Sequence, residues 1–432
     1  MYSYWIFFER GYCMSSYKIS GGRRISGELN IQGSKNSVLP ILASTYLLDG
    51  KSVIHNCPKL SDTVGTVNIL KSLGCKVNFD GNTVTVDSSG ANGFEISESL
   101  MHEMRSSIIF LGAILGKVGK AVISTPGGCE IGLRPIDLHL YAVKRLGVTV
   151  NEEYGKLNCF VEKGLTGNKI TFSFPSVGAT ENAILLSVKA KGETTVVNCA
   201  REPEIIDLCN FLNKCGAKIS GAGESIIVIN GVEKLYPCEH SVISDRIVTT
   251  TYLLAGAITG GEVNLKNTNP EHLQGVLPLL EEMGCSFNIR CKDIRLKAPK
   301  RLNKINKIVT QPYPGFPTDA QAPFCAASAV ANGTTVVVEN IFESRFKHIP
   351  ELNRMGAKIR TEGRVSVIDG VERLYGAEVF SPDLRGGAAL VLAGLCAEGE
   401  TIVRNVGFID RGYENLENNL CSLNGDIVRR EY

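Results

Sequence analysis

The segment 126–139, Pro-Gly-Gly-Cys-Glu-Ile-Gly-Leu-Arg-Pro-Ile-Asp-Leu-His, contains a cysteine whose surroundings would suit chemistry. An apolar run typical of a strand precedes it at 121–125, and the two glycines before Cys129 predict a loop that can expose the thiol. Arg134 follows closely, and a nearby cation favours the nucleophilic thiolate. A surface loop with an incidental cysteine would have the same composition, so the pattern alone leaves both interpretations open.

Lysine and arginine recur in short polar strings that could bind an anion. Gly33-Ser34-Lys35-Asn36 precedes an alanine-rich stretch, where Ser34 or Asn36 could cap a helix, or Lys35 could join the helix N–H groups in an anion site. The other strings are Met104-Arg105, Ser244-Asp245-Arg246, Phe316-Pro317-Thr318-Asp319, Glu343-Ser344-Arg345, Pro382-Asp383-Leu384-Arg385 and Ile409-Asp410-Arg411-Gly412-Tyr413-Glu414. Each could equally be a helix cap or a solvated ion pair.

Two sets of glycines indicate that a unit of about 70 residues is repeated six times. Each glycine of the first set follows a stretch with helical periodicity and precedes an alternating stretch, which predicts a helix that ends in a left-handed residue before a strand. The first set is Gly74, Gly147, Gly216, Gly284, Gly356 and, in a weaker copy, Gly425. The second set, which ends alanine-rich helices, is Gly50, Gly119, Gly192, Gly261, Gly333 and Gly399. Together they predict six β-α-β-α-β-β units.

These units would position the polar strings. The alanine-rich helices at 39–48 and 388–397 are apolar on all sides, so we expect them to be buried with sheets packed around them. Equivalent loops of a six-fold duplicated fold converge on one face, so their arginines would form a guanidinium cluster. Such a cluster suits a small, multiply anionic substrate such as a phosphate-carboxylate. The chain length favours two domains of three units each.

Composition excludes several other classes of protein. The chain has 432 residues, of which 44% are apolar and 21% charged, as in ordinary globular proteins. Its net charge of +2 is small for a protein that binds nucleic acid along the backbone, and no apolar stretch reaches the roughly 20 residues of a membrane span. Fourteen cysteines without a C-x-x-C pair predict reduced, mostly buried thiols in a cytosolic protein, and six scattered histidines predict no metal site.

Two glycine-containing motifs and the N-terminus carry no chemistry. Gly50-Lys51-Ser52 and Gly221-Ala222-Gly223 each lack a glycine that the phosphate-binding and dinucleotide-binding motifs require. Residues 1–13 contain six aromatic side chains, including Trp5, and differ from the rest of the chain. We expect translation to begin at Met14, so that residues 1–13 are a non-native or disordered extension.

From about Tyr17 onward, the sequence resembles the UDP-N-acetylglucosamine enolpyruvyl transferases of the enolpyruvyl transferase family. The matching strings are Gly33–Asn36, the segment 126–139, Ser-Val-Gly-Ala-Thr-Glu-Asn at Ser176–Asn182, Ala200-Arg201-Glu202-Pro203-Glu204, Phe-Pro-Thr-Asp at Phe316–Asp319 and Asp-Arg-Gly-Tyr-Glu at Asp410–Glu414. The resemblance implies an α/β fold of two inverse α/β-barrel domains, each of three β-α-β-α-β-β repeats around buried helices. It implies a first domain at 35–242, with a catalytic loop at 126–139, and a second at 14–34 plus 243–432.

The resemblance also implies an activity: transfer of enolpyruvate from phosphoenolpyruvate to the 3-hydroxyl of UDP-N-acetylglucosamine, with release of phosphate and without a cofactor. This is the first committed step of peptidoglycan synthesis. Cys129 would be the general acid and Asp319 the base. Phosphate and carboxylate would be bound by Lys35, Arg105, Arg134, Arg345, Arg385 and Arg411. The nucleotide sugar would be bound by Asn36, Arg134, Pro135, Ile136, Asp137, Leu138, Ser176, Val177 and Gly178, and the arginines oriented by Asp245 and Asp383.

Three positions depart from the pattern that the resemblance implies. Phe174 stands where some members have a lysine, so one diphosphate contact would fall to Arg134, and Glu130 beside the cysteine would raise the pKa of the thiol. Gly386-Gly387 replaces a less flexible pair. Two alternatives remain. One is a transferase that acts on shikimate 3-phosphate, but such enzymes lack the Gly-Gly-Cys loop and the Ser-Val-Gly-Ala-Thr string. The other is a non-catalytic UDP-sugar-binding protein, but this chain has a suitable residue at every catalytic position that the resemblance implies.

Overall fold

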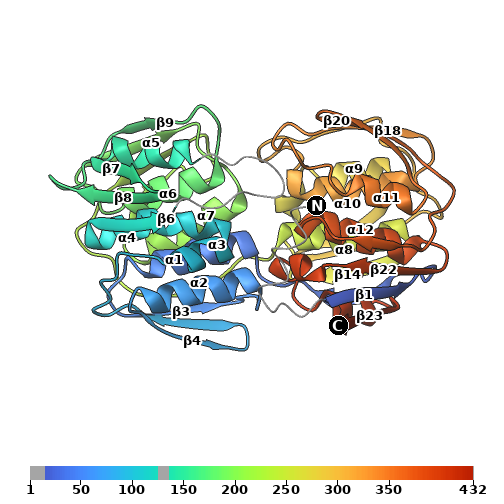
Figure 1. Cartoon of the computed structure of the whole chain (residues 1–432), viewed down its shortest axis with the longest axis horizontal. Helices are drawn as coiled ribbons and strands as arrows, with labels where there is room; N and C mark the ends of the chain where they lie inside the picture. Colours follow the sequence, from blue (N-terminus) through green and yellow to red (C-terminus); the bar gives the residue numbers. More distant parts are fainter. Residues whose placement is uncertain (1–14, 125–135, 432) are drawn as a thin grey trace.

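The computed structural model describes residues 15–124 and 136–431, without the side chains of His102, Glu103 and Arg105. The interpretation of residues 1–13 and the start at Met14 therefore lie outside the described residues. Figure 1 shows two lobes side by side. We call lobe 1 the half whose buried core lies between Val38 and Val242, and lobe 2 the half whose core combines Tyr17–Ile31 with Val248–Ile427.

Helices and strands alternate along lobe 1. Its elements are α1 (Lys35–Thr45), β3 (Lys51–His55), α2 (Ser61–Ser72), β4 (Lys76–Asp80), β5 (Thr83–Asp87), α3 (Glu98–Glu103), η2 (Arg105–Ile109), α4 (Phe110–Val118), β6 (Lys120–Ser124), α5 (Asp137–Arg145), β7 (Val148–Glu153), β8 (Lys156–Val161), β9 (Lys169–Thr171), α6 (Val177–Ser187), β10 (Glu193–Val197), α7 (Pro203–Lys214), β11 (Lys218–Ser220), β12 (Ile226–Asn230) and β13 (Glu239–Ser241).

Lobe 2 repeats this order but takes its first two strands from the beginning of the described chain. Its elements are β1 (Ser15–Ser20), β2 (Ser26–Asn30), α8 (Arg246–Ile258), β14 (Glu262–Lys266), η3 (Pro270–Leu273), α9 (Leu277–Glu282), β15 (Ser286–Arg290), β16 (Asp293–Lys297), β17 (Lys307–Val309), α10 (Thr318–Ala329), β18 (Thr334–Val338), α11 (Ile349–Arg354), β19 (Lys358–Glu362), β20 (Val365–Asp369), β21 (Glu378–Phe380), α12 (Leu384–Cys396), β22 (Glu400–Arg404), η4 (Val406–Arg411), α13 (Leu416–Ser422) and β23 (Ile427–Glu431).

Over the described residues, each lobe has three small sheets, one per predicted unit. The strand orders are β13-β3-β5-β4, β6-β8-β7 and β11-β12-β10-β9 in lobe 1, and β15-β16-β14-β2, β17-β18-β20-β19 and β21-β22-β1-β23 in lobe 2. Each four-stranded sheet has one parallel edge pair, such as β13 with β3, and antiparallel pairs elsewhere. The second unit keeps only an isolated parallel bridge between Glu95 and Val122 in place of this edge strand. The six predicted β-α-β-α-β-β units are therefore confirmed, with one unit shortened.

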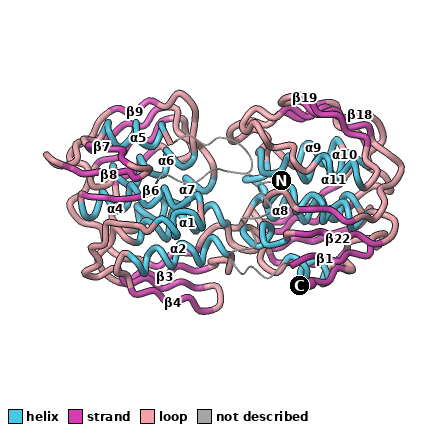
Figure 2. The backbone as a smooth tube through the Cα atoms, viewed as in Figure 1, coloured by secondary structure: helices cyan, strands magenta, loops and turns pink. Residues whose placement is uncertain are grey.

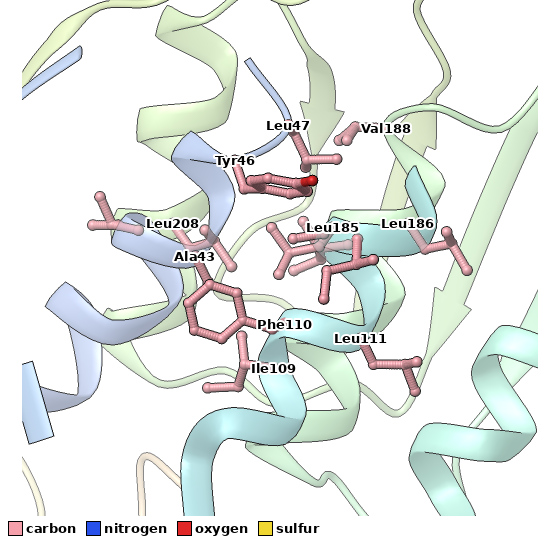
Figure 3. Packing of buried hydrophobic residues seen from close by; sticks show 14 of the residues in the cluster. Ala43, Tyr46, Leu47, Ile109, Phe110, Leu111, Leu185, Leu186, Val188 and Leu208 are labelled. Carbon is pink, nitrogen blue, oxygen red and sulfur yellow. The ribbon is translucent and has the colours of Figure 1, made fainter. Parts of the chain in front are cut away.

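Helices fill the inside of each lobe and strands form its outside (Figure 2). The central helices are α1, α4 and α6 in lobe 1 and α8, α10 and α12 in lobe 2. The predicted burial of 39–48 and 388–397 is confirmed, except that Cys396 is half-buried. Figure 3 shows packed side chains from α1 and its C-cap, from α4 and α6, and from the middle of α7, among them Ala43, Tyr46, Phe110, Leu111, Leu185, Leu186 and Leu208.

The repeated glycines end the outer helices as predicted. Gly74, Gly147, Gly216, Gly284 and Gly356 have φ between 91° and 98°, a left-handed conformation that glycine adopts without strain. The prediction of Gly425 for the sixth unit is wrong by one residue: Asn424, with φ of 70°, follows the C-cap Leu423 as Gly74 follows Leu73. Asparagine tolerates this conformation better than most residues with a side chain.

Two adjacent segments connect the lobes. Residues 31–34 leave β2 for α1, and residues 242–245 leave β13 for α8, with an antiparallel bridge between Gly33 and Ser244. Ser34 N–H donates to the carbonyl oxygen of Ile243 at 2.7 Å, and Asp245 N–H donates to that of Gln32 at 3.0 Å. We call these two segments the crossing segments. They lie where the polar strings Gly33–Asn36 and Ser244–Arg246 enter their helices.

Candidate functional site

Most of the predicted site residues lie at the N-terminal ends of the central helices. Lys35 begins α1, Arg105 begins η2 just before α4, Ser176 precedes α6, Asp245 precedes α8, Asp319 is the second residue of α10, and Asp383 and Arg385 flank the start of α12. A helix N-terminus presents unpaired N–H groups and a partial positive charge, which attract anions. The six-fold repeat therefore places one candidate site position at the same point of every unit.

The first cluster joins Lys35 and Arg411 through Asp62. The carboxylate of Asp62, on α2, lies 2.7 Å from Lys35 Nζ and 3.0 Å from Arg411 Nε. Asp62 is 3% exposed, and Arg411 reaches it from η4 of lobe 2, so this cluster bridges the lobes. Burial raises the pKa of Asp62, but Lys35 and Arg411 outweigh it and hold that pKa below its usual range.

The cluster around Lys35 carries two neighbouring positive charges. Burial lowers the pKa of Lys35, Asp62 opposes that change, and Arg411 and Arg385 lower it further. Cations from both lobes thus converge, as the sequence predicted.

The second cluster joins Asp319 to Arg345 and Arg385. Asp319 Oδ1 lies 2.5 Å from Arg345 Nη2, and Asp319 Oδ2 lies 3.3 Å from Arg385 Nη2. Both arginines are 3% exposed. Arg345 Nε and Arg385 Nε and Nη1 are buried without a hydrogen-bond partner among the described residues. Buried guanidinium hydrogens usually have partners, so these groups are suited to a bound anion.

Asp245 and Asp383 bind backbone amides rather than guanidinium groups. Asp245 Oδ1 accepts from Ile247 N–H at 2.8 Å, and its Oδ2 accepts from Lys35 N–H at 3.1 Å. Asp383 Oδ1 accepts from the N–H groups of Arg385 and Gly386 at 2.9 and 3.0 Å. Each carboxylate therefore fixes the backbone that carries a cation of the site.

The expected capping of α1 by its own sequence is wrong. Ser34 occupies the cap position, but its side chain makes no capping hydrogen bond and its Oγ is buried without a partner among the described residues. The Lys35 N–H is instead bound by Asp245 from the other crossing segment. Asn36 lies half-buried in the first turn of α1.

The predicted nucleotide-binding residues lie where α5 meets α6. Ile136 precedes α5, which begins with Asp137 and Leu138, and Ser176 Oγ caps α6 by accepting from Ala179 N–H at 3.4 Å. A Cβ at Gly178 would lie 2.9 Å from His139 Cε1, so only glycine permits this approach. Asn182 Nδ2 donates to His139 Nδ1 at 2.8 Å and locks the two helices together. Val177 is the first residue of α6, and Phe174 is 42% exposed beside it.

Several predicted residues cannot be placed. Cys129, Glu130, Arg134 and Pro135 lie outside the described residues, and so does the side chain of Arg105. Within the part of the chain that is described, the structure brings together Lys35 with Arg411 and Asp319 with Arg345 and Arg385.

The sequence reasoning missed the acidic partners of these cations. Asp62 had one local signal, its position in the first turn of a helix, which does not reveal contacts with Lys35 and Arg411. Glu204 was quoted only as part of a motif, yet it pairs with Arg246 Nε at 3.0 Å across the lobes, with both side chains buried. His348 is completely buried beside Arg345 and Gly386. The sequence did not predict this position, because a single histidine outside a motif carries no signal for its neighbours.

Neither a metal-binding cluster nor a membrane-spanning helix is present among the described residues. They include no group of three or more His, Cys, Asp or Glu side chains arranged to hold a metal ion. They also include no helix of sufficient length and apolarity to span a membrane.

The fold and the site together define a two-lobed α/β protein, three repeats to a lobe, with cations and carboxylates paired at the starts of its central helices. The sequence profile of "EPSP synthase (3-phosphoshikimate 1-carboxyvinyltransferase)" matches residues 19–420. The chain therefore belongs to the enolpyruvyl transferase family that this profile describes.

Curated relatives are similar over nearly the whole chain. The UDP-N-acetylglucosamine 1-carboxyvinyltransferase 2 of Caldanaerobacter subterraneus subsp. tengcongensis is 50% identical over 418 residues, which cover 96% of this chain and 100% of the relative. The UDP-N-acetylglucosamine 1-carboxyvinyltransferase 1 of Symbiobacterium thermophilum is 48% identical over 418 residues, 96% of this chain and 95% of the relative.

Solved structures confirm the fold. The enolpyruvyl transferase NikO from Streptomyces tendae superposes with a TM-score of 0.88 at 26% identity, covering 97% of this chain and 100% of that one. EPSP synthase from Acinetobacter baumannii superposes with a TM-score of 0.73 at 19% identity, covering 96% and 100%. The predicted architecture of two three-repeat α/β domains around buried helices is thus confirmed.

Proposed function

We propose that this protein transfers enolpyruvate from phosphoenolpyruvate to the 3-hydroxyl of UDP-N-acetylglucosamine and releases phosphate. The observation that carries the proposal is the convergence of Lys35, Arg411, Arg345 and Arg385 around Asp62 and Asp319 at the starts of the central helices. Relatives about half identical over 96% of the chain bear the name of this activity.

In this proposal the cations bind the small substrate. Phosphoenolpyruvate carries a phosphate and a carboxylate, and Arg345 and Arg385 offer buried N–H groups without partners among the described residues. Lys35 and Arg411 offer two more cations, which Asp62 holds in place. Cations fixed before the reaction stabilise charge that develops in the transition state without further reorganisation. Arg105 and Arg134 would complete the set.

Asp319 would be the base that removes the proton of the sugar hydroxyl. Its carboxylate is 28% exposed, so a substrate can reach it, while two guanidinium groups fix its orientation. As the hydroxyl oxygen attacks C2 of phosphoenolpyruvate, C3 must gain a proton, and Cys129 would supply it as the general acid. The nucleotide sugar would contact Asn36, Arg134–Leu138 and Ser176–Gly178, and Asp245 and Asp383 would hold the cation-bearing turns.

The role of Cys129 leads to the first prediction. Cys129→Ala should abolish turnover and should prevent covalent labelling by an epoxide such as fosfomycin, because the thiol is the proposed acid and nucleophile. Intact mass after incubation with the epoxide measures the labelling. Cys291→Ala is the matched control, because Cys291 is an exposed thiol on the surface and its loss should change neither result. Epoxide labelling that persists in Cys129→Ala would refute the assignment.

A second candidate acceptor is shikimate 3-phosphate, which the family profile names. The Gly-Gly-Cys loop and the Ser-Val-Gly-Ala-Thr string favour the nucleotide sugar, as do relatives at 44 to 50% identity against EPSP synthase structures at 19 to 20%. Phosphate release from phosphoenolpyruvate should require UDP-N-acetylglucosamine and should not occur with shikimate 3-phosphate. Release with neither acceptor present, or with shikimate 3-phosphate alone, would contradict the proposal, and no release with either would favour a non-catalytic binding protein.

The remaining parts of the proposal concern domains and place. We propose that residues 35–242 form one domain and residues 14–34 plus 243–432 the other, in line with the two separate cores. We place the reaction in the cytoplasm, at the first committed step of peptidoglycan synthesis and hence of cell-wall growth, with phosphoenolpyruvate and UDP-N-acetylglucosamine as the partners and neither a metal nor nucleic acid.

A further inference from the structure

Two cysteines that are distant in the sequence lie in contact outside the candidate site. The Sγ atoms of Cys215 and Cys238 are 3.4 Å apart. Cys215 is fully buried at the C-cap of α7, and Cys238 is half-buried in the segment that leads to β13. Tyr236 N–H donates to the carbonyl oxygen of Cys215 at 2.8 Å and ties the two segments together. A disulfide requires the sulfurs to approach to about 2.05 Å, so a movement of little more than 1 Å would join them.

The two thiols differ in reactivity. The two sulfurs share a hydrogen bond in which either thiol can donate. This contact lowers the pKa of the Cys238 thiol, burial opposes the effect, and the charge of Lys214 adds to it. The same hydrogen bond, together with burial, raises the pKa of Cys215. Other thiols, such as Cys57 and Cys325, are buried alone, and burial raises their pKa values. Cys238 is half-buried and can be reached by a small reagent, whereas Cys215 is fully buried. Cys238 therefore suits the role of attacking thiolate and Cys215 that of resolving thiol.

We propose that Cys215 and Cys238 form a redox-sensitive dithiol, which a low-molecular-weight disulfide oxidises to an intramolecular disulfide. The Cys238 thiolate attacks one sulfur of the small disulfide, which forms a mixed disulfide and releases one small thiolate. Cys215 loses its proton to solvent and attacks the Cys238 sulfur, which releases the second small thiol. Two electrons and two protons pass from the protein to the reagent, so the balance is complete.

A polar chain connects this dithiol to the crossing segments. Lys214 Nζ lies 3.3 Å from His240 Nδ1, and His240 Nε2 lies 2.9 Å from Asp207 Oδ1. Asp207 Oδ2 accepts from Ile243 N–H at 3.2 Å and from the hydroxyl of Ser37 on α1. Cys215 and Cys238 stand one and two residues from the first two members of this chain. We therefore expect a movement of the two sulfurs to shift Lys214 and His240 and, through Asp207, to affect Ile243 and α1.

The test uses the reduced, folded full-length protein and oxidised glutathione. The protein is incubated with oxidised glutathione, and the thiols that remain free are then blocked with N-ethylmaleimide. Peptide mapping should find Cys215 linked to Cys238, with a mass about 2 Da below that of the two reduced peptides. The exposed thiols Cys291 and Cys421 should carry glutathione and thereby show that the reagent is active. Glutathione on Cys291 and Cys421 without the Cys215–Cys238 link would overturn the proposal.

Two variants separate the roles of the thiols. Cys215→Ser should accumulate glutathione on Cys238, because the mixed disulfide has no resolving thiol, whereas Cys238→Ser should leave Cys215 unmodified. The reverse pattern would overturn the assigned roles. Amide hydrogen exchange at Ile243 measures the coupling: oxidation should change its rate at least tenfold in the native protein and leave it unchanged in Cys238→Ser. An unchanged rate in the oxidised native protein would overturn the link to the crossing segments.

Discussion

At the scale of single residues, acidic side chains explain why the cations of the site can be buried together. Asp62 holds Lys35 and Arg411, and Asp319 holds Arg345 and Arg385. Ionised groups in a protein interior are costly unless they are paired, so each carboxylate stabilises two positive charges that would otherwise repel each other. If the site binds phosphoenolpyruvate as proposed, its cations are already held in place before this anion binds.

Asp62→Asn should destabilise the protein because it leaves Lys35 without its buried counter-charge. Removal of one partner of a buried ion pair typically costs about 3–5 kcal/mol, and we expect a loss near the lower end because Arg411 is 37% exposed. Chemical denaturation measures the free energy of unfolding. Glu378→Gln is the matched control: the Glu378–Arg404 pair is largely exposed, so its loss should cost less than about 1 kcal/mol. Equal losses for both variants would contradict this account.

Glu181 should make stability depend on pH. This side chain is 3% exposed on α6, and burial, together with Glu204 and Glu202, raises its pKa well above 4.5. A pKa raised by folding gives stability that is complete below the pKa of the unfolded chain and is lost as the pH rises through that of the folded protein. Glu181→Gln stays neutral, so its Tm relative to the native protein should rise progressively from pH 4.5 to pH 8. A constant difference in Tm over this range would contradict the prediction.

At the scale of elements, the repeat decides where function is located. In five of the six units a central helix starts after an edge strand, and the residues at that start are Lys35, Ser176, Asp245, Asp319 and Arg385. The sheets supply the frame and the helix starts supply the partial positive charge. The units therefore share one architecture and differ in the one or two residues at the start of the central helix.

The sequence predicted these elements better than it predicted their contacts. The glycine rule finds the left-handed position after each outer helix, but it does not decide whether glycine or asparagine fills it, and so Asn424 was missed. Local capping rules offered Ser34 or Asn36 as the cap of α1, whereas the Lys35 N–H is bound by Asp245, 210 residues further on. Asp62 and Arg411 are separated by 349 positions, so nothing in either neighbourhood indicates the other. Contacts between residues that are distant in the sequence could therefore not be predicted from a single sequence.

Gly33→Ala should disrupt the crossing segments. A Cβ at this position would lie 1.7 Å from the carbonyl oxygen of Asn56, and backbone on both sides leaves no room for adjustment. We expect a loss of about 3 kcal/mol or more in the free energy of unfolding. The matched control is Gly407→Ala, whose Cβ would have no neighbour within 4 Å and whose effect should stay within about 0.5 kcal/mol. A Gly33→Ala protein as stable as the control would show that the crossing segments adapt easily.

At the scale of the whole molecule, the part of the chain that the structure describes contains few covalent and polar links between the lobes. Among the described residues, links besides the two crossing segments include Asp62–Arg411, Glu204–Arg246, Glu202 with the backbone of Tyr313, and Lys59 N–H, which donates to Glu414 at 3.1 Å. Closure of lobes over a substrate is a common way to exclude water from a reaction, and lobes with so few links can move as bodies.

Saturation with UDP-N-acetylglucosamine should draw the lobes together. The nucleotide sugar would contact the starts of α1, α5 and α6 in lobe 1 and Asp319 in lobe 2, so its binding favours the closed arrangement. Small-angle X-ray scattering should record a smaller radius of gyration with this ligand. GDP-mannose at the same concentration, whose base and sugar differ, should leave the radius unchanged. An unchanged radius at saturation with UDP-N-acetylglucosamine would contradict closure.

The pairing of β1 has a consequence for how the chain is made. Tyr17 and its neighbours form hydrogen bonds with β22 around Val403 and with β23 around Arg429, close to the last residues described (Figure 1). A ribosome adds roughly 5–20 residues per second, so this strand must wait tens of seconds for its partners while the whole of lobe 1 emerges and can already fold. An early, unpaired strand of this kind is a natural substrate for chaperones. Fusions or truncations near either end should therefore leave lobe 2 incompletely folded at a point where lobe 1 still folds normally.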